Sequence, residues 1–221
     1  MVKIKILIAD DHAVVRDGTR QILEAEEDMD VVAEAADGAE AVKLSGSARP
    51  DVAIIDIAMP GVDGIEATRQ IKSLYPSIAV LILSAYDDDQ FVFSLLEAGA
   101  AGYLLKSVRG RELIDAVRQV YAGESVLHPT IARKVLNRFV QAPGKEAGQK
   151  PSEILSEREL EVLKSATRGM SNQDIADELC LSLRTVQAHL GHIFNKLQVS
   201  SRTEAVVRAL KEGWVTLEDI P

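Results

Sequence analysis

The feature that most constrains this 221-residue chain is a run of four apolar residues, Val52–Ile55, that leads directly into one acid, Asp56. The turn-forming residues Pro60 and Gly61 follow. A short apolar run bounded by turn residues predicts a buried strand with Asp56 at its carboxyl end. In open parallel α/β sheets, ligands bind at that end. Taken alone, Asp56 is still better explained as a turn residue or strand cap.

Five apolar runs alternate with helical patterns over the first half of the chain. The runs are Ile4–Ala9, Val31–Ala35, Val52–Ile55, Ile78–Leu83 and Gly102–Leu105. A first helix with Val14, Ile22 and Leu23 on its apolar side is expected, and later helices are predicted over 37–44, 65–74, 91–98 and 112–121. Strands that alternate with helices predict a parallel sheet covered on both faces. We therefore expect an α/β fold, a flavodoxin-like (βα)5 doubly wound parallel sheet.

Reactive polar residues follow four of these five strands. Asp10 and Asp11 follow the first, Asp56 the third, Ser84 the fourth and Lys106 the fifth. Three carboxylates at one edge repel each other unless a cation is present, and Mg²⁺ suits such a set of oxygen ligands. A carboxylate beside a metal, an ammonium and a hydroxyl is typical of phosphoryl transfer through an aspartyl phosphate.

Residues 1–123 resemble a response-regulator receiver domain. The motifs that carry the resemblance are Ala9-Asp10-Asp11-His12, Asp56 with Met59-Pro60-Gly61, Ser84-Ala85 and Gly102-Tyr103-Leu104-Leu105-Lys106. The resemblance implies that Asp56 accepts the phosphoryl group. It also implies that Asp11, Asp56 and the backbone carbonyl of Ala58 hold Mg²⁺, with Asp10 reaching the ion through water.

The same resemblance assigns roles to the other polar residues. Lys106 would bind the phosphoryl group, and Ser84 and Tyr103 would form a switch pair. We expect Tyr103 to turn from an exposed to a buried position on phosphorylation. Ser107 stands where many receivers have proline. His12 is expected to begin the first helix and to take no part in the chemistry.

Residues 124–151 are expected to join two domains. A helical pattern covers His128–Val140, and the polar stretch Gln141–Pro151 follows, with two prolines, two glycines and no periodicity. This composition is typical of an interdomain linker. The chain is thus divided into a phosphoacceptor domain over 1–123, a helix and linker over 124–151, and a second domain over 152–221.

The second domain is predicted to be entirely helical. Glu159 lies three residues after Ser156, which is the spacing of a capping box. A tight turn at Cys180 and Leu181 separates two further helices, over 172–179 and 183–197, as in a helix-turn-helix. The serines expected to start the four helices are Ser156, Ser171, Ser182 and Ser201.

The net charge of −9 argues against general binding to polyanions. The second domain is itself net acidic, yet the window Leu179–Thr203 contains no acid. Its basic residues and histidines are Arg184, His189, His192, Lys196 and Arg202. This distribution predicts that one local face of the second domain binds a polyanion. The alternative is that these basic residues only form a solvent-exposed helix face.

Residues 155–214 resemble a LuxR-type helix-turn-helix. The motifs are Leu155–Leu163, Ser171–Ala176, Arg184–Leu190 and Lys196-Leu197. A receiver joined to this module resembles the NarL/FixJ group of response regulators, in which the helix 183–197 would enter the major groove. This resemblance implies that Gln187, Ala188 and Gly191 face the bases. It also implies that the residues nearer the phosphates are Ser182, Arg184, Thr185 and Lys196, and it adds His189 to the DNA-binding set.

The resemblance further implies the partners of the protein. These would be a sensor histidine kinase, double-stranded promoter DNA, a second copy of the chain paired through the last helix, and RNA polymerase as a further candidate.

One cysteine, Cys180, excludes an intramolecular disulfide and suits a reducing compartment. Because no membrane span or signal peptide is recognisable, we expect a cytoplasmic protein with no membrane partner.

Two other classes of function fit parts of the pattern. A Mg²⁺-dependent phosphatase or phosphotransferase acting on small molecules would use the same carboxylates, but no insert after any strand is long enough to form a substrate cap. A pure interaction module, in which residues 152–221 bind protein, would need no DNA-binding face. Activity on a soluble phosphomonoester and a mobility shift with genomic fragments discriminate these alternatives.

Overall fold

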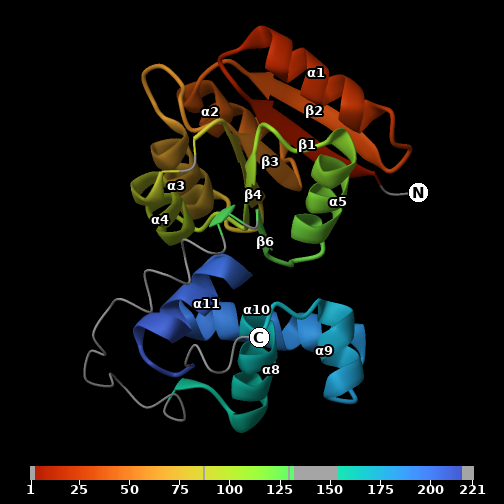
Figure 1. Cartoon of the computed structure of the whole chain (residues 1–221), viewed down its shortest axis with the longest axis vertical. Helices are drawn as coiled ribbons and strands as arrows, with labels where there is room; N and C mark the ends of the chain where they lie inside the picture. The colour runs from red at the N-terminus through yellow and green to blue at the C-terminus, as the bar shows by residue number, and fades with distance from the viewer. Residues whose placement is uncertain (1–2, 87, 129, 132–153, 216–221) are drawn as a thin grey trace. The chain divides into compact units, whose positions relative to one another are not determined.

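The computed structural model describes residues 3–86, 88–128, 130–131 and 154–215 (Figure 1). The chain divides into two compact units, 1–131 and 132–221, and each is described by itself. Apart from residues 128 and 130–131, the helix expected over 128–140 lies outside the described residues. The linker expected over 141–151 lies outside them as well.

The first unit is a parallel sheet with helices on both faces. Its strands, in the spatial order β2-β1-β3-β4-β5-β6, pair in parallel throughout. They are β1 Ile4–Ala9, β2 Met29–Ala35, β3 Val52–Ile55, β4 Ala79–Ser84, β5 Gly102–Leu105 and β6 Val126–Leu127. The first five follow the flavodoxin-like order, so the predicted fold class is confirmed.

Five helices connect these strands. They are α1 Ala13–Glu24, α2 Gly38–Ala48, α3 Gly64–Leu74, α4 Asp89–Glu97 and α5 Gly110–Tyr121. Helices α1 and α5 lie together on one face of the sheet, and α2, α3 and α4 cover the other (Figure 1). All four residues of β3 are buried between these two layers. Burial on both faces explains why the strands are continuous apolar runs.

Two details of the first unit differ from the sequence-based expectations. Of the three residues expected on the apolar side of α1, Leu23 is fully buried, whereas Val14 is 85% and Ile22 38% exposed, because α1 turns Thr19 and Leu23 toward the core. The strand β6 was not expected, since its two residues are too few to show a period. Otherwise the elements agree to within a few residues at their ends, where helices commonly fray.

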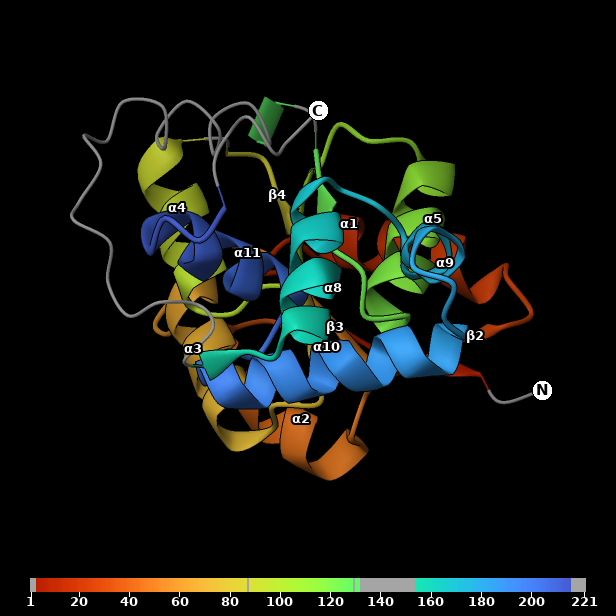
Figure 2. The ribbon, with the colours of Figure 1, turned by 90° about the horizontal axis from the view of Figure 1, so that it is seen from below.

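The second unit contains four described helices, α8 Glu157–Thr167, α9 Asn172–Glu178, α10 Leu183–Leu197 and α11 Arg202–Lys211. Each begins at one of the four predicted serines, whose hydroxyl accepts a hydrogen bond from the backbone N–H three residues later. The 15-residue α10 packs against α8, α9 and α11 (Figure 2). Val162, Val186 and Ile193 are fully buried in the shared core.

The turn between α9 and α10 is tight. Cys180 has a φ of 52°, in the left-handed region, and the N–H of Leu181 donates to the carbonyl of Ala176 at 2.8 Å. The predicted helix-turn-helix is therefore formed. Within the described part of the chain, no helix is long and apolar enough to cross a membrane.

Candidate functional site

The carboxyl edge of the sheet brings the predicted polar residues together. The N–H of Asp56 donates to the carbonyl of Ala9, which ties the end of β3 to the end of β1. The ammonium of Lys106 then lies 2.7 Å from Asp10 Oδ2 and 2.8 Å from Asp56 Oδ2. Side chains from three different strand ends thus meet at one point, the ammonium group of Lys106.

The electrostatics of this site are set by burial and by that shared ammonium. Burial raises the pKa of Asp56 above its usual range, although the hydrogen bond from Lys106 opposes the shift. Burial lowers the pKa of Lys106, but its hydrogen bonds to Asp10 and Asp56 outweigh this and hold it above the ordinary value. The acids therefore favour the cationic form of Lys106, whereas the ionised form of Asp56 would gain from a second positive charge.

The acids of this edge could hold a metal ion. Asp10, Asp11, His12 and Asp56 offer ligand atoms that all lie within 4.8 Å of one another. Carboxylate oxygens are the ligands that Mg²⁺ prefers, so the residues fit that ion. Ala58, whose carbonyl is the expected backbone ligand, is an exposed residue of the loop that follows β3.

Two residues that support this edge were not singled out from the sequence. The guanidinium of Arg16, on α1, donates to the carbonyl of Asp10 at 2.6 Å, and its Nε lies 3.6 Å from Glu34 Oε2. A Cβ on Gly64 would lie 2.1 Å from the carbonyl oxygen of Asp56, so only glycine fits where α3 begins. Arg16 looks like any charged residue of a helix, and a close backbone approach leaves no pattern in the sequence.

The expected switch pair lies on the neighbouring strands β4 and β5, but Tyr103 differs from its expected resting position. The Tyr103 ring is already fully buried, and its hydroxyl donates to the carbonyl of Tyr86 at 2.9 Å. The hydroxyl of Ser84, also buried, accepts the N–H of Tyr86 at 3.2 Å. The ring is stable inside because this carbonyl satisfies its hydroxyl, so the exposed starting position was wrong.

In the second unit, the expected base-reading positions gather on one side of α10. Arg184, Gln187 and Ala188 are exposed, and Gly191 is half-buried with open space where a Cβ would stand. Val186, Leu190, Ile193 and Leu197 face the core instead. The outward residues recur three and four apart, which is the spacing of one helix face.

Two further positions at the start of α10 are tied to each other. The hydroxyls of Ser182 and Thr185 lie 2.7 Å apart, and the Ser182 hydroxyl also accepts the N–H of Thr185. His189 is half-buried. The first turn of α10 therefore presents short donors in a fixed arrangement.

Lys196 makes an ion pair within the unit. Its ammonium donates to Glu159 Oε2 at 2.6 Å, and the same carboxylate accepts the N–H and hydroxyl of Ser156. Burial alone would raise the pKa of Glu159, but these hydrogen bonds lower it to about 2. The charge of Lys196, expected to lie near phosphates, is thus shared with an acid of α8.

The comparisons with known proteins agree with this geometry. Residues 6–118 match the family model described as the response regulator receiver domain. The chain belongs to the response regulators. Residues 153–209 match a second model, described as bacterial regulatory proteins of the luxR family. The protein is therefore a two-component transcriptional regulator with a receiver domain and a LuxR-type DNA-binding domain.

Individual relatives cover almost the whole chain. It is 44% identical to the oxygen regulatory protein NreC of Staphylococcus carnosus (strain TM300) over 211 residues, 94% of this chain and 97% of that protein. The crystal structure of ChrA, a response regulator of a heme-sensing two-component system, is 39% identical, covers 97% of this chain and all of its own, and has a TM-score of 0.53. A structure of two RcsB dimers bound to two parallel DNAs is 25% identical, covers 95% and 98%, and has a TM-score of 0.56.

The Glu159 carboxylate predicts a pH dependence of stability. Its pKa is lowered in the folded state, so its contribution is fully present above its unfolded value of about 4.3 and is lost as the pH falls toward about 2. Glu159→Gln should cost about 1–2 kcal/mol at pH 7 and much less near pH 3. Trp214, the single tryptophan and part of this core, reports urea unfolding by fluorescence.

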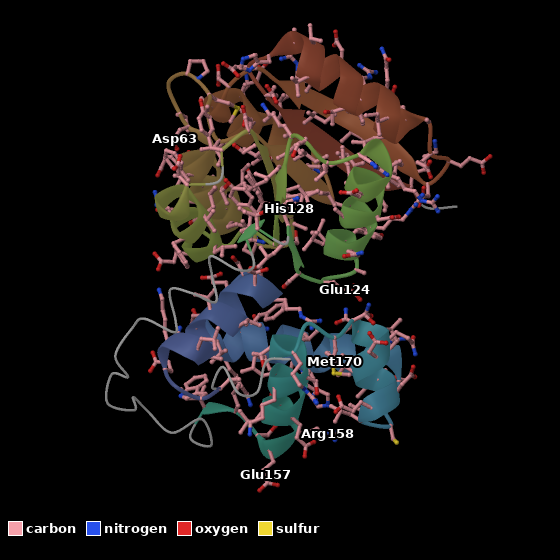
Figure 3. All side chains as sticks on the ribbon, in the orientation of Figure 1. Asp63, Glu124, His128, Glu157, Arg158 and Met170 are labelled. Atoms are coloured by element: carbon pink, nitrogen blue, oxygen red, sulfur yellow. The ribbon has the colours of Figure 1, made fainter. Side chains whose placement is uncertain are left out.

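Glu157 provides the matched control, because it is the exposed first residue of α8 (Figure 3). Glu157→Gln should leave the pH profile of unfolding close to that of the wild type. A Glu159→Gln protein that is as stable as wild type at every pH would show that the pair with Lys196 contributes nothing.

Proposed function

We propose that this regulator is switched by Mg²⁺-dependent transfer of a phosphoryl group from a sensor histidine kinase to Asp56. The observation that carries the proposal is the position of the Asp56 carboxylate. It is buried at the end of β3, 2.8 Å from the Lys106 ammonium and close to the ligand atoms of Asp10 and Asp11. A nucleophilic carboxylate beside a cation and a set of metal ligands is what phosphoryl transfer requires.

In this mechanism an oxygen of Asp56 attacks phosphorus, and the bond from phosphorus to the kinase histidine breaks as the new P–O bond forms. Lys106 leaves its hydrogen bonds to carboxylates and donates to the phosphoryl oxygens. When bound, Mg²⁺ would be held by Asp11, Asp56 and the carbonyl of Ala58, with Asp10 through water, and would supply positive charge to the same oxygens.

The switch would run through the backbone of Tyr86. Ser84, whose hydroxyl now accepts the Tyr86 N–H, would turn toward the new phosphoryl oxygens. Tyr103 would follow, because its hydroxyl holds the carbonyl of the same residue. A movement here would re-shape the surface formed by α4 and α5, a local charge change acting on a bistable element.

We propose that the protein acts as a phosphoacceptor and DNA-binding regulator and is not an enzyme, with hydrolysis of its own aspartyl phosphate as its only turnover. The alternative, a phosphatase or phosphotransferase for small molecules, would need a cap over the acids. The described loops after β4 and β5, residues 85–88 without the undescribed residue 87 and residues 106–109, are too short to form one.

The output would be sequence-specific binding of double-stranded promoter DNA by a homodimer. We propose that α10 enters the major groove and that α11 pairs two copies on DNA. Two observations support this: the outward face of α10, and the RcsB structure, in which dimers of that protein are bound to DNA. The proposed contacts are Gln187, Ala188 and Gly191 for bases, and Ser182, Arg184, Thr185, His189 and Lys196 for the backbone.

We propose the domain boundaries expected from the sequence, 1–123, 124–151 and 152–221, with β6 at Val126–Leu127 as an extension of the sheet of the first domain. RNA polymerase is a further proposed partner, because a regulator of transcription acts on that enzyme. The proposed place of action is the cytoplasm, where bacterial DNA and the kinase domain of a sensor meet.

The first prediction concerns the phosphoacceptor. After incubation with a small phosphodonor and Mg²⁺, the intact mass should rise by one phosphoryl group. Asp56→Ala should gain none, and removal of Mg²⁺ with a chelator should stop the reaction, because the acids would then repel the incoming anion. Asp17→Ala, at an exposed position of α1, should react as the wild type does. Phosphorylation of Asp56→Ala would show that another residue accepts the group.

The second prediction separates phosphate contacts from base contacts. Arg184→Ala should weaken binding to all DNA sequences and reduce the salt slope by about one for each lost contact. Gln187→Ala should instead change the preference at one base pair, by roughly 1–3 kcal/mol. Titrations on specific and random duplexes at several salt concentrations measure both effects. Equal losses on the two duplexes would remove Gln187 from the base-reading set.

The third prediction tests transmission through Ser84. Phosphorylated wild type should bind DNA more tightly, and about 1.4 kcal/mol of preference for one state would give a tenfold gain. Ser84→Ala should lose most of this gain at equal Asp56 occupancy, measured by mass, whereas Ser47→Ala, at an exposed position of α2, should keep it. A full gain in Ser84→Ala would show that the hydroxyl is not the transmitter. No gain in the wild type would mean that DNA binding is constitutive.

A further inference from the structure

The ring of His12 lies at the rim of the acidic pocket, although the sequence pointed only to a helix start. His12 does precede α1, and its side chain makes no capping hydrogen bond there. Its Nδ1 instead lies 2.7 Å from Asp11 Oδ1 and 3.4 Å from Asp10 Oδ1. The imidazole is therefore turned back toward the carboxylates.

The backbone of His12 is fixed on both sides. Its N–H donates to Asp10 Oδ1 at 2.9 Å, and its carbonyl accepts the N–H groups of Val15 and Arg16. Arg16 in turn donates from its guanidinium to the carbonyl of Asp10 at 2.6 Å. The first turn of α1 is thus tied to the loop that carries the acids. Because the backbone is already ordered, binding a ligand would cost the rotamer freedom of the His12 side chain, which is 66% exposed, but little backbone entropy.

The spacing of the four side chains suits one ion. Bonds of about 2.1 Å place neighbouring ligands of an octahedral ion about 3.0 Å apart and opposite ligands about 4.2 Å apart. The candidate atoms of Asp10, Asp11, His12 and Asp56 all lie within 4.8 Å of one another. The widest separation therefore exceeds that of opposite ligands by at most about 0.6 Å.

The donor set determines which ion gains from this arrangement. Mg²⁺ takes oxygen ligands and retains water, so an imidazole adds little to its binding. Divalent transition ions such as Mn²⁺, Co²⁺, Ni²⁺ and Zn²⁺ accept imidazole nitrogen, with affinities that rise from manganese through cobalt to nickel. A mixed set of three carboxylates and one imidazole therefore favours a transition ion over Mg²⁺.

We propose that His12 is a metal ligand, and that this pocket binds a divalent transition ion through Asp10, Asp11, His12 Nδ1 and Asp56 more tightly than it binds Mg²⁺. The inference rests on the pocket of the proposed function and adds a nitrogen ligand to it. Asp10 would contact such an ion directly, and the 2.7 Å contact between His12 Nδ1 and Asp11 Oδ1 would give way to two bonds to the metal.

The test compares metal binding by the full-length wild type and His12→Asn, because asparagine is a favourable residue before a helix and is too short to replace the ring. Titration calorimetry should show Ni²⁺ affinity at least about tenfold lower in the variant, with Mg²⁺ affinity nearly unchanged. Pulsed electron paramagnetic resonance of bound Mn²⁺ should show coupling to ¹⁴N in the wild type and none in the variant.

Two controls make the outcome decisive. His192→Gln, at an exposed position of α10, should retain the wild-type ratio of Ni²⁺ to Mg²⁺ affinity. An unchanged ratio in His12→Asn, the lack of ¹⁴N coupling in wild type, or a loss that follows His192 instead would overturn the proposal. Asp11→Asn should weaken both ions; if Mg²⁺ binds neither wild type nor this variant, the metal site of the proposed function fails as well.

Discussion

The site in the first unit depends on the ion pairs that the Lys106 ammonium makes. This ammonium lies within 2.8 Å of carboxylates from two different strand ends, Asp10 and Asp56, which would otherwise repel each other. Because Asp56 is 3% exposed, its charge is poorly solvated and its pKa is raised. One ammonium beside two carboxylates leaves the pocket with a net negative charge. The pocket therefore favours the binding of a second cation or of an electrophile. Burial favours the neutral form of Asp56, whereas attack on phosphorus requires its ionised form. Stability and chemistry therefore make opposite demands on the same three side chains.

The sequence predicts this site well because the sheet topology alone determines where the strand ends meet. Once the strands are known to be parallel, the residues that follow them lie at the same edge, which is where the structure places Asp10, Asp56 and Lys106. Contacts made by side-chain direction could not be predicted in this way. The ring of His12 turns back to Asp11, and Arg16 reaches the Asp10 carbonyl, through rotamers that depend on neighbours in three dimensions.

The second unit follows the same division. Its helix starts were predictable, because a serine hydroxyl caps a helix through local contacts three residues apart. The inward residues of α10 follow from its helical period. The pair between Lys196 and Glu159 spans 37 residues and two helices, so no local pattern predicts it. The pair also changes the charge expected for the DNA-binding face. Lys196 lies in the window Leu179–Thr203, which contains no acid, yet its charge is neutralised by Glu159 from outside that window.

Tyr86 illustrates how a fold can couple two side chains through a shared backbone. Its N–H is held by the hydroxyl of Ser84 at the end of β4, and its carbonyl by the hydroxyl of Tyr103 on β5. Both side chains are buried, so neither hydroxyl can exchange this partner for bulk water at little cost. If the Ser84 hydroxyl turns away, the N–H of Tyr86 loses its acceptor and the loop must adjust. The Tyr103 hydroxyl takes part in that adjustment, because it is bound to the carbonyl of the same residue. In the proposed switch, the coupling arises from the two hydrogen bonds to the backbone of Tyr86, and it needs no large movement of the ring.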